Sequence, residues 1–153
     1  MSDQVIPSPF SLDFSNKNFL EPLPDNLFQA AKSYFLPNEL DLLQKAFNVA
    51  NIAHKDQFRQ EGSPYITHPI AVTLILLDLH LDLETVCSGM MHDVLEDSLF
   101  KKSFLEKLFG KGTVAIIDGV SNLNKLDFDS LEDRNANNLQ KMALAMSKDV
   151  RVI

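Results

Sequence analysis

A histidine and three carboxylates lie close together in one stretch of this sequence. His92 is followed directly by Asp93, and Glu96 and Asp97 come one helical turn later. On a helix, His92 and Asp93 would be separated by about 100°, so an imidazole nitrogen and a carboxylate oxygen could reach one ion. Carboxylates crowded at the end of an apolar helix repel one another, and a divalent cation is the simplest way to neutralise them. A second histidine from a neighbouring helix, such as His68, would complete much of a metal site.

The same residues also have an interpretation without a metal. His92 and Asp93 could pair with each other, while Glu96 and Asp97 cap the helix in solvent. An isolated His-Asp dipeptide is a weak motif and does not separate the two cases. From residue types and spacing alone, the metal site and the plain ion pair both stay open.

The elements that must position these residues read as helices. Apolar residues recur at helical spacing, with a break near Pro37. The apolar run 66–79 fits a buried strand or a buried helix, and its length favours the helix. We expect helices over residues 24–35, 38–50, 66–79, 83–94, 101–109, 113–126 and about 131–146, with stops at Gly110 and Gly112 and a polar loop at 127–130. Since no segment alternates with a period of two, the sequence predicts an all-α helical bundle.

Composition and charge limit the class of protein. The 153 residues are 45% hydrophobic and 23% charged, as in an ordinary globular domain. A net charge of −7 argues against broad attraction to nucleic acid, so a polyanionic substrate must be met locally. The only cysteine, Cys87, fits a reducing cytosol, and no segment approaches the ~20 apolar residues of a membrane span. We expect a cytoplasmic protein that binds neither nucleic acid nor membrane.

The remaining histidines and the N-terminal stretch receive no role in chemistry. His54 lies near the helix face of Phe47 and Ala50, and we expect it to be a satisfied core histidine. His80 is expected to close a helix or to face solvent. Residues 1–23 mix prolines with small polar residues, which indicates a variable leader before one domain over 24–153.

Several separated motifs in this sequence resemble, in order and spacing, the hydrolase domain of the RelA/SpoT family. They are AHKDQFR at 53–59, Gly62, PYITHP at 64–69, HDVLED at 92–97, GVSNL at 119–123 and NLQKMALAMSKDVRVI at 138–153. The resemblance covers roughly residues 38–153. It implies a helical bundle of the HD-domain phosphohydrolase type that removes pyrophosphate from the ribose 3′ position of ppGpp or pppGpp.

The resemblance also implies a cofactor, Mn²⁺ held by two histidines and two aspartates. His68, His92 and Asp93 match three of these ligands. In the family, the apolar run at 149–153 continues into a motif that supplies the last aspartate. We therefore expect the HD domain to be incomplete at its C-terminal end here, and this chain to be impaired in metal binding and hydrolysis.

Further roles are implied around the metal. Glu96 and Asp97 match the acidic pair that positions or activates the attacking water, and Arg59 matches the arginine that packs against the guanine base. Four positions depart from the family: Gln60 replaces a basic residue, Glu61 a small polar one, Asn122 a lysine and Gln140 an arginine. These departures weaken the expectation for contacts on the guanine side.

The resulting hypothesis is a guanosine-3′,5′-bis(diphosphate) 3′-pyrophosphohydrolase of the stringent response. Synthetase and regulatory domains would follow the hydrolase in the full-length protein. One alternative is another HD phosphohydrolase that acts on a different nucleotide. The second is a catalytically weak HD module with a regulatory or partner-binding role.

Overall fold

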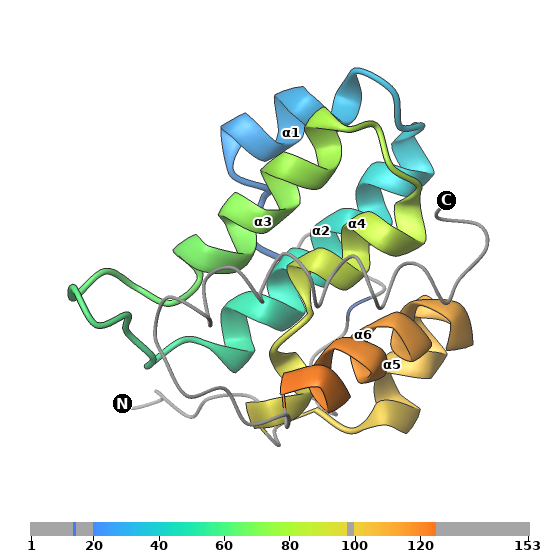
Figure 1. The fold of residues 1–153 in the computed structure, drawn as a ribbon. Coiled ribbons are helices and arrows are strands. Elements are labelled where there is room, and N and C mark those ends of the chain that lie inside the picture. The colour runs from blue at the N-terminus through green and yellow to red at the C-terminus, as the bar shows by residue number, and fades with distance from the viewer. Residues whose placement is uncertain (1–13, 15–19, 98–99, 125–153) are drawn as a thin grey trace, which may run out of the picture.

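The computed structural model describes residues 14, 20–97 and 100–124, which form six α-helices and one short 3-10 helix (Figure 1). The helices are α1 (Asp25–Lys32), α2 (Pro37–Ala53), α3 (Thr67–Asp78), α4 (Leu83–Met90), η2 (Val94–Asp97), α5 (Lys102–Phe109) and α6 (Lys111–Asn124). Within these described residues the only β-type pairing is an isolated bridge between Phe58 and Pro64. The prediction of an all-α bundle is confirmed. None of the described helices is long and apolar enough to cross a membrane.

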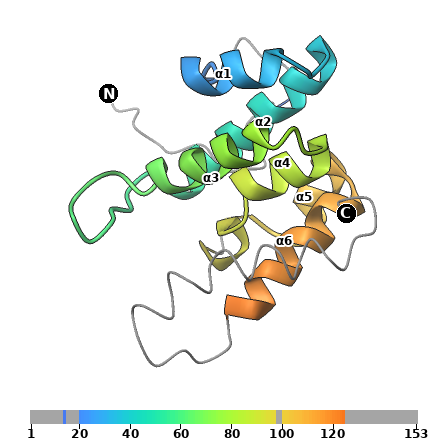
Figure 2. The same ribbon diagram turned by 45° about the horizontal axis from the view of Figure 1, so that its top comes forward.

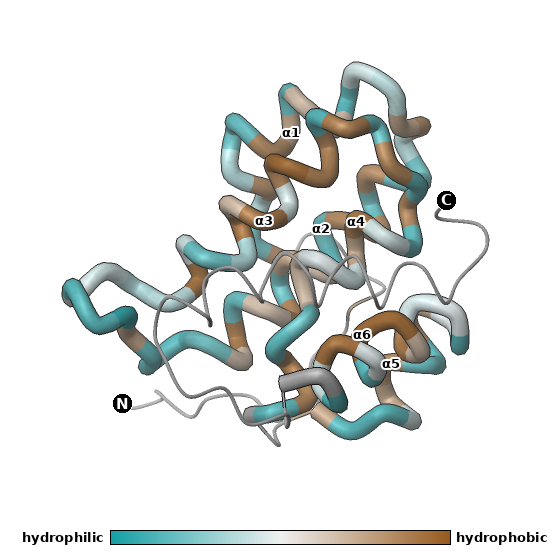
Figure 3. The backbone as a smooth tube through the Cα atoms, in the orientation of Figure 1, coloured by the Kyte–Doolittle hydropathy of each residue, from teal (hydrophilic) through white to brown (hydrophobic). Residues whose placement is uncertain are grey.

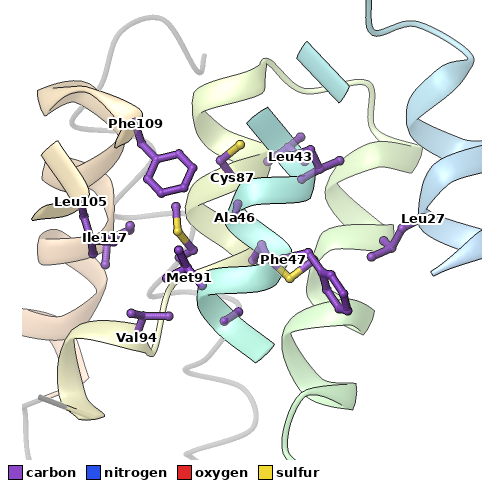
Figure 4. Close-up of a cluster of buried hydrophobic side chains, with 14 of the residues drawn as sticks. Leu27, Leu43, Ala46, Phe47, Cys87, Met91, Val94, Leu105, Phe109 and Ile117 are labelled. Atoms are coloured by element: carbon purple, nitrogen blue, oxygen red, sulfur yellow. The ribbon is translucent and has the colours of Figure 1, made fainter. Parts of the chain in front are cut away.

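Helix α4 lies at the centre of the bundle. It packs against α2, α3 and α6, while α1 covers α3 and α5 covers α6 (Figures 1 and 2). The core follows the inner faces of these helices, as the close-up of its side chains shows (Figure 4). It includes Leu27, Leu43, Ala46, Phe47, Cys87, Met91, Val94, Leu105, Phe109 and Ile117. The residues that follow α4 continue into η2, which contacts both α2 and α6.

Most predicted helix boundaries agree with the structure to within a few residues. Helix α2 begins at Pro37, and the Glu39 carboxylate accepts a hydrogen bond of 2.8 Å from the backbone N–H of Leu36. Gly110 ends α5 with a φ of 89°, a conformation that glycine adopts at low cost. Gly112, however, is not a stop. Helix α6 begins at Lys111, because Gly110 alone is enough to turn the chain.

Residues before α1 also contribute to the packing. Phe14 and Leu20 are buried, and the Asn48 side chain forms hydrogen bonds of 2.8 and 2.9 Å with the backbone N–H and C=O of Glu21. Where it is described, the predicted leader is thus attached to α2. The loop predicted at 127–130 and the helix predicted at about 131–146 lie outside the described residues.

Helices α3 and α4 approach each other closely at Gly89. A Cβ atom at this position would lie 2.2 Å from Cδ1 of Leu76 and 3.5 Å from Cγ1 of Val72. The absence of a side chain at Gly89 therefore permits this close approach of α3 and α4. The approach matters for the site, because α3 carries His68 and His92 follows α4.

We expect Gly89→Ala to lower the free energy of unfolding by about 1–3 kcal/mol, because Leu76 must leave its rotamer in a packed core. In a Leu76→Ala background the same change should become neutral or stabilising, since alanine favours a helix over glycine by about 1 kcal/mol. Urea unfolding of the two single variants and the double variant tests this. Additive effects in the double variant would contradict the proposed contact.

Candidate metal centre

Three of the residues singled out in the sequence come together between α3 and the end of α4. His68 lies in the first turn of α3, and His92 and Asp93 follow α4 directly. One ligand atom of each residue lies within 4.8 Å of the other two, and the imidazole rings of the histidines are 5.1 Å apart at an angle of 74°. His92 is 8% exposed. The described residues thus contain a His/Asp cluster that could hold a metal ion.

The backbone around His92 differs from the predicted helix over 83–94. Helix α4 ends at Met90, Met91–Asp93 form a turn, and the chain continues as the 3-10 helix η2. The imidazole Nδ1 of His92 donates a 2.7 Å hydrogen bond to the carbonyl oxygen of Gly89. In a continuing α-helix, the carbonyl oxygen of Gly89 would accept a hydrogen bond from the backbone N–H of Asp93. Here it accepts one from the His92 side chain instead. The argument from a 100° separation on a helix was therefore wrong, although His92 and Asp93 still lie side by side.

The same hydrogen bond makes His92 suitable as a metal ligand. Because a carbonyl oxygen only accepts, Nδ1 must carry a proton, which leaves a lone pair on Nε2 of the neutral ring. Nε2 lies 3.1 Å from Oδ2 of Asp93, so two electron-pair donors face each other. A proton or a cation between them is required to make this contact favourable. The donor set fits a divalent cation at this position.

The charges of the cluster favour a positive group between Nε2 of His92 and Oδ2 of Asp93. Burial opposes ionisation of Asp93, but its bond to His92 and the nearby histidines outweigh burial and hold its pKa below the usual value. Burial likewise opposes protonation of His92, yet its bond to Asp93 and the charges of Asp93 and Glu96 raise its pKa. For His68, burial and the neighbouring His92 lower the pKa. A proton on His92 therefore competes with a bound cation.

We expect the affinity for a divalent cation to fall as the pH is lowered, because the cation needs the lone pair on Nε2 of His92. Since the pKa of His92 is raised, the loss should begin above the ordinary histidine value of about 6.5. Calorimetric titration of the chain with Mn²⁺ between about pH 5.5 and 8 measures this. An affinity that stays constant over this range would contradict the ligand role.

Of the acidic pair that follows the cluster, only the Glu96 side chain is described by the structure. Glu96 lies on η2 and lines a cavity of about 220 Å³ together with Asp93, Tyr65, His54 and Gln57. Its charge contributes to the raised pKa of His92. Asp97 is the last residue of η2, and its side chain lies outside the described part of the structure. The acidic pair lies on a 3-10 helix rather than one turn further along α4.

Arg59 lies in the hydrophilic segment between α2 and α3, which projects from the bundle (Figures 2 and 3). Its backbone N–H and C=O form hydrogen bonds of 2.8 and 2.9 Å with Ser63 and Gly62, and Gly62 has a φ of 100°. The side chain is 42% exposed and lies 3.6 Å from the Glu61 carboxylate. An exposed pair of this kind contributes little to stability. Arg59 thus lies outside the His/Asp cluster, next to a carboxylate where a small polar residue was expected.

Tyr65 is a member of the site that the sequence analysis did not identify. Its hydroxyl donates a hydrogen bond to Oδ2 of Asp93, the oxygen that faces His92. Its ring contacts those of His54 and His68, with centroids 4.7 and 5.7 Å away. Burial and the charge of Asp93 raise the pKa of Tyr65, so the hydroxyl stays a donor. The bond to Asp93 spans 28 residues, so the only local indication of this role is that Tyr65 lies three residues before His68.

We expect Tyr65→Phe to weaken binding of a divalent cation about 10-fold, because Asp93 loses the hydrogen bond that fixes the orientation of its carboxylate. The matched control is Tyr34→Phe, which also removes one hydroxyl. Tyr34 donates a 2.8 Å hydrogen bond to the carbonyl oxygen of Leu81, and neither residue belongs to the cluster. Titration calorimetry with Mn²⁺ should show the loss in the first variant only. An equal loss in both variants would indicate a general effect on folding.

Comparisons with known proteins identify the family of this chain. Residues 46–153 match the family model described as the HD domain. The chain is 41% identical over 129 residues to the bifunctional (p)ppGpp synthase/hydrolase SpoT of Escherichia coli K12, covering 84% of this chain and 18% of that protein. It is 42% identical over 129 residues to the guanosine-3′,5′-bis(diphosphate) 3′-pyrophosphohydrolase of Vibrio cholerae, with the same coverage. A GTP pyrophosphokinase of Myxococcus xanthus is 35% identical over 133 residues, 85% of this chain and 18% of that protein. The chain thus spans about a fifth of the length of these relatives.

Proposed function

This chain belongs to the HD domain family, and from that premise we propose that it is the hydrolase part of a guanosine-3′,5′-bis(diphosphate) 3′-pyrophosphohydrolase. The observation that carries the proposal is the cluster of His68, His92 and Asp93 beside a cavity that Glu96 lines. Relatives that bear this name, at 41–46% identity, support the choice of substrate. Both ppGpp and pppGpp are proposed substrates.

We propose Mn²⁺ as the cofactor, held by Nε2 of His92, an imidazole nitrogen of His68 and Oδ2 of Asp93. Nitrogen and oxygen donors without a thiolate suit manganese, although they do not select it over other divalent ions. A divalent cation bound here would supply three effects: it acidifies water, polarises a phosphoryl oxygen and neutralises developing negative charge. The contribution of the protein is then mainly geometry.

In the proposed reaction, the oxygen of a water molecule forms a bond to the phosphorus of the 3′-diphosphate that is attached to the ribose. The bond between that phosphorus and the ribose 3′ oxygen breaks, the 3′ oxygen takes up a proton, and GDP and pyrophosphate are the products from ppGpp. Glu96, with Asp97 beside it in the chain, orients the water and takes up its proton. The guanidinium of Arg59 stacks on the guanine base, which orients the nucleotide.

The direct test measures release of pyrophosphate from ppGpp by the purified chain, with Mn²⁺ and with an excess of chelator. GTP and ATP serve as competing substrates, since another HD phosphohydrolase would prefer a different nucleotide. The proposal is supported if pyrophosphate is released from ppGpp but not from GTP or ATP, and only when Mn²⁺ is present. The family match and the names of the relatives do not favour a non-catalytic module. Absence of turnover with Mn²⁺ bound, both in this chain and in a version extended through the next helix, would restore that alternative.

The cytoplasm is the proposed location. Cys87 is a buried, unpaired thiol, and burial raises its pKa, so that it stays protonated and unreactive. A thiol of this kind is compatible with a reducing compartment, where disulfides are rare.

A further inference from the structure

A second cavity lies beside η2, apart from the one at the metal centre. It has a volume of about 490 Å³ and is lined by residues of η2, of the beginning of α5 and of the last turns of α6. Pockets of about 300–1,000 Å³ are typical of small-molecule sites. Leu95 of η2 lines this cavity, whereas the next residue, Glu96, lines the cavity at Asp93. The two cavities are thus neighbours, and the proposed hydrolysis uses only the one at Asp93.

Lysines give the second cavity a positive charge. Lys101 and Lys102 both line it, together with Asp118. Nζ of Lys102 lies 2.8 Å from Oδ1 of Asp118, so these two charges neutralise each other. Lys101 forms no ion pair within the part of the chain that the structure describes. Its positive charge is therefore left over, in a chain whose net charge is −7.

The same lysines lie at the N-terminal end of α5, where the helix itself attracts anions. The backbone N–H groups of a first helical turn carry partial positive charge and need hydrogen-bond acceptors. In α5 no side chain caps them, since Lys101 occupies the N-cap position. The lysine ammonium has no acceptor to offer and repels the same partial charge. An anion bound here supplies the missing acceptor and pairs with Lys101.

A hydroxyl on α6 indicates a ligand independently of the helix end. Ser121 lines the cavity and is only 8% exposed. Its hydroxyl forms no hydrogen bond with any described residue, and its oxygen is not among the fully enclosed side-chain atoms that lack a partner. A molecule in the cavity can therefore reach this oxygen. Because a largely buried hydroxyl without a partner is unfavourable, an occupant with hydrogen-bond acceptors suits this position.

We propose that this second cavity binds a phosphate or diphosphate group. Its oxygens accept hydrogen bonds from three sources: the hydroxyl of Ser121, the ammonium of Lys101 and the backbone N–H groups of the first turn of α5. A terminal phosphate has three oxygens for these three sources, whereas a carboxylate has two. Lysine binds phosphate as a point charge, and helix N-termini are common phosphate sites.

Two molecules can bring this group to the cavity. One is free inorganic pyrophosphate, and the other is ppGpp, whose 5′-diphosphate would occupy the cavity while its 3′-diphosphate lies at the metal centre. Since Leu95 and Glu96 are adjacent on η2, a nucleotide with diphosphates on two carbons of its ribose can contact both cavities. The second source rests on the proposed function, but the phosphate site itself does not.

Titration of the metal-free chain with inorganic pyrophosphate tests the site directly. In ¹H–¹⁵N spectra, the backbone amides of Lys102 and Ser103 should shift as pyrophosphate binds. We expect Lys101→Gln and Ser121→Ala each to weaken this binding about 3- to 10-fold, because each removes one donor. The matched control is Lys107→Gln, the same change in the last turn of α5 and away from the cavity, which should bind pyrophosphate normally.

The melting temperature separates a binding role of Lys101 from a structural one. Without pyrophosphate, Lys101→Gln should melt at the same temperature as the unaltered chain or slightly higher, because it removes a cation from a helix N-terminus. With pyrophosphate, the unaltered chain should gain more than this variant. The proposal is overturned if the amides of Lys102 and Ser103 do not shift at millimolar pyrophosphate, or if Lys107→Gln loses as much affinity as Lys101→Gln.

Hydrolysis kinetics distinguish the two sources of the phosphate. Guanosine 3′-diphosphate keeps the bond that is cleaved but lacks the 5′-diphosphate. If Lys101→Gln raises KM for ppGpp and not for this compound, the group is the 5′-diphosphate of the substrate; if neither KM changes while pyrophosphate binding is weakened, the site takes a separate anion. An equal rise of both KM values would place Lys101 at the metal centre and overturn the proposal. A chain that does not hydrolyse ppGpp contradicts the proposed function, and the amide titration then still decides about the phosphate site.

Discussion

Replacing His92 by asparagine is expected to weaken Mn²⁺ binding about 100-fold or more and to abolish metal-dependent hydrolysis. Asparagine can still donate to the carbonyl oxygen of Gly89 from the position of Nδ1, but it has no counterpart of Nε2. The change therefore removes the ligand atom that faces Oδ2 of Asp93 at 3.1 Å and preserves the hydrogen bond that ends α4. Loss of a direct ligand should exceed the 10- to 100-fold effects typical of residues that only orient ligands.

Two readouts and one control make this result specific. Titration calorimetry gives the affinity, and the melting temperature should rise with Mn²⁺ in the unaltered chain but not in His92→Asn, because only a ligand bound to the folded state stabilises it. The matched control is His80→Asn, at a position with a φ of 53° that asparagine tolerates. His80 stacks on Tyr34, outside the cluster, so this variant should bind Mn²⁺ normally. Normal binding in His92→Asn would remove His92 from the site.

The fold was predictable because helical periodicity is strong in this chain. Apolar spacing located α1 to α6, and Pro37 and Gly110 mark ends whose causes are local to the backbone. The end of α4 was not predictable in the same way. It depends on a hydrogen bond from the His92 side chain to the carbonyl oxygen of Gly89. This bond competes with the backbone hydrogen bond of a continuing helix, and the spacing of apolar residues does not predict it.

The candidate site was predictable only in part, and for a similar reason. His92 and Asp93 are adjacent in sequence, so they share a location whether the backbone forms a helix or a turn. The contact of Tyr65 with Asp93 depends on how the segment between α2 and α3 lies against the turn that follows α4. No local pattern in the sequence records such a contact, whereas the burial of His54 was predicted from its place near the helix face of Phe47 and Ala50.

The second large effect is expected for Glu96→Gln, which should lower kcat for ppGpp hydrolysis about 10²- to 10⁴-fold, the range for loss of a general acid or base. Glutamine has nearly the same shape as glutamate but cannot take a proton from water. Glu96 lines the cavity next to Asp93 and is itself exposed, so the substitution should leave folding intact. Glu96 is not part of the His/Asp cluster, and Mn²⁺ affinity should therefore change only a few-fold.

The separation between kcat and metal affinity is what distinguishes Glu96 from the ligands. A variant of His68, His92 or Asp93 should lose both together, whereas Glu96→Gln should lose kcat alone. Glu106→Gln on α5 is the matched control, because the same chemical change is made away from the cavity. If Glu96→Gln retained the kcat of the unaltered chain, the proton acceptor would have to be sought elsewhere, and Asp97, next to it at the end of η2, would be the residue to replace next.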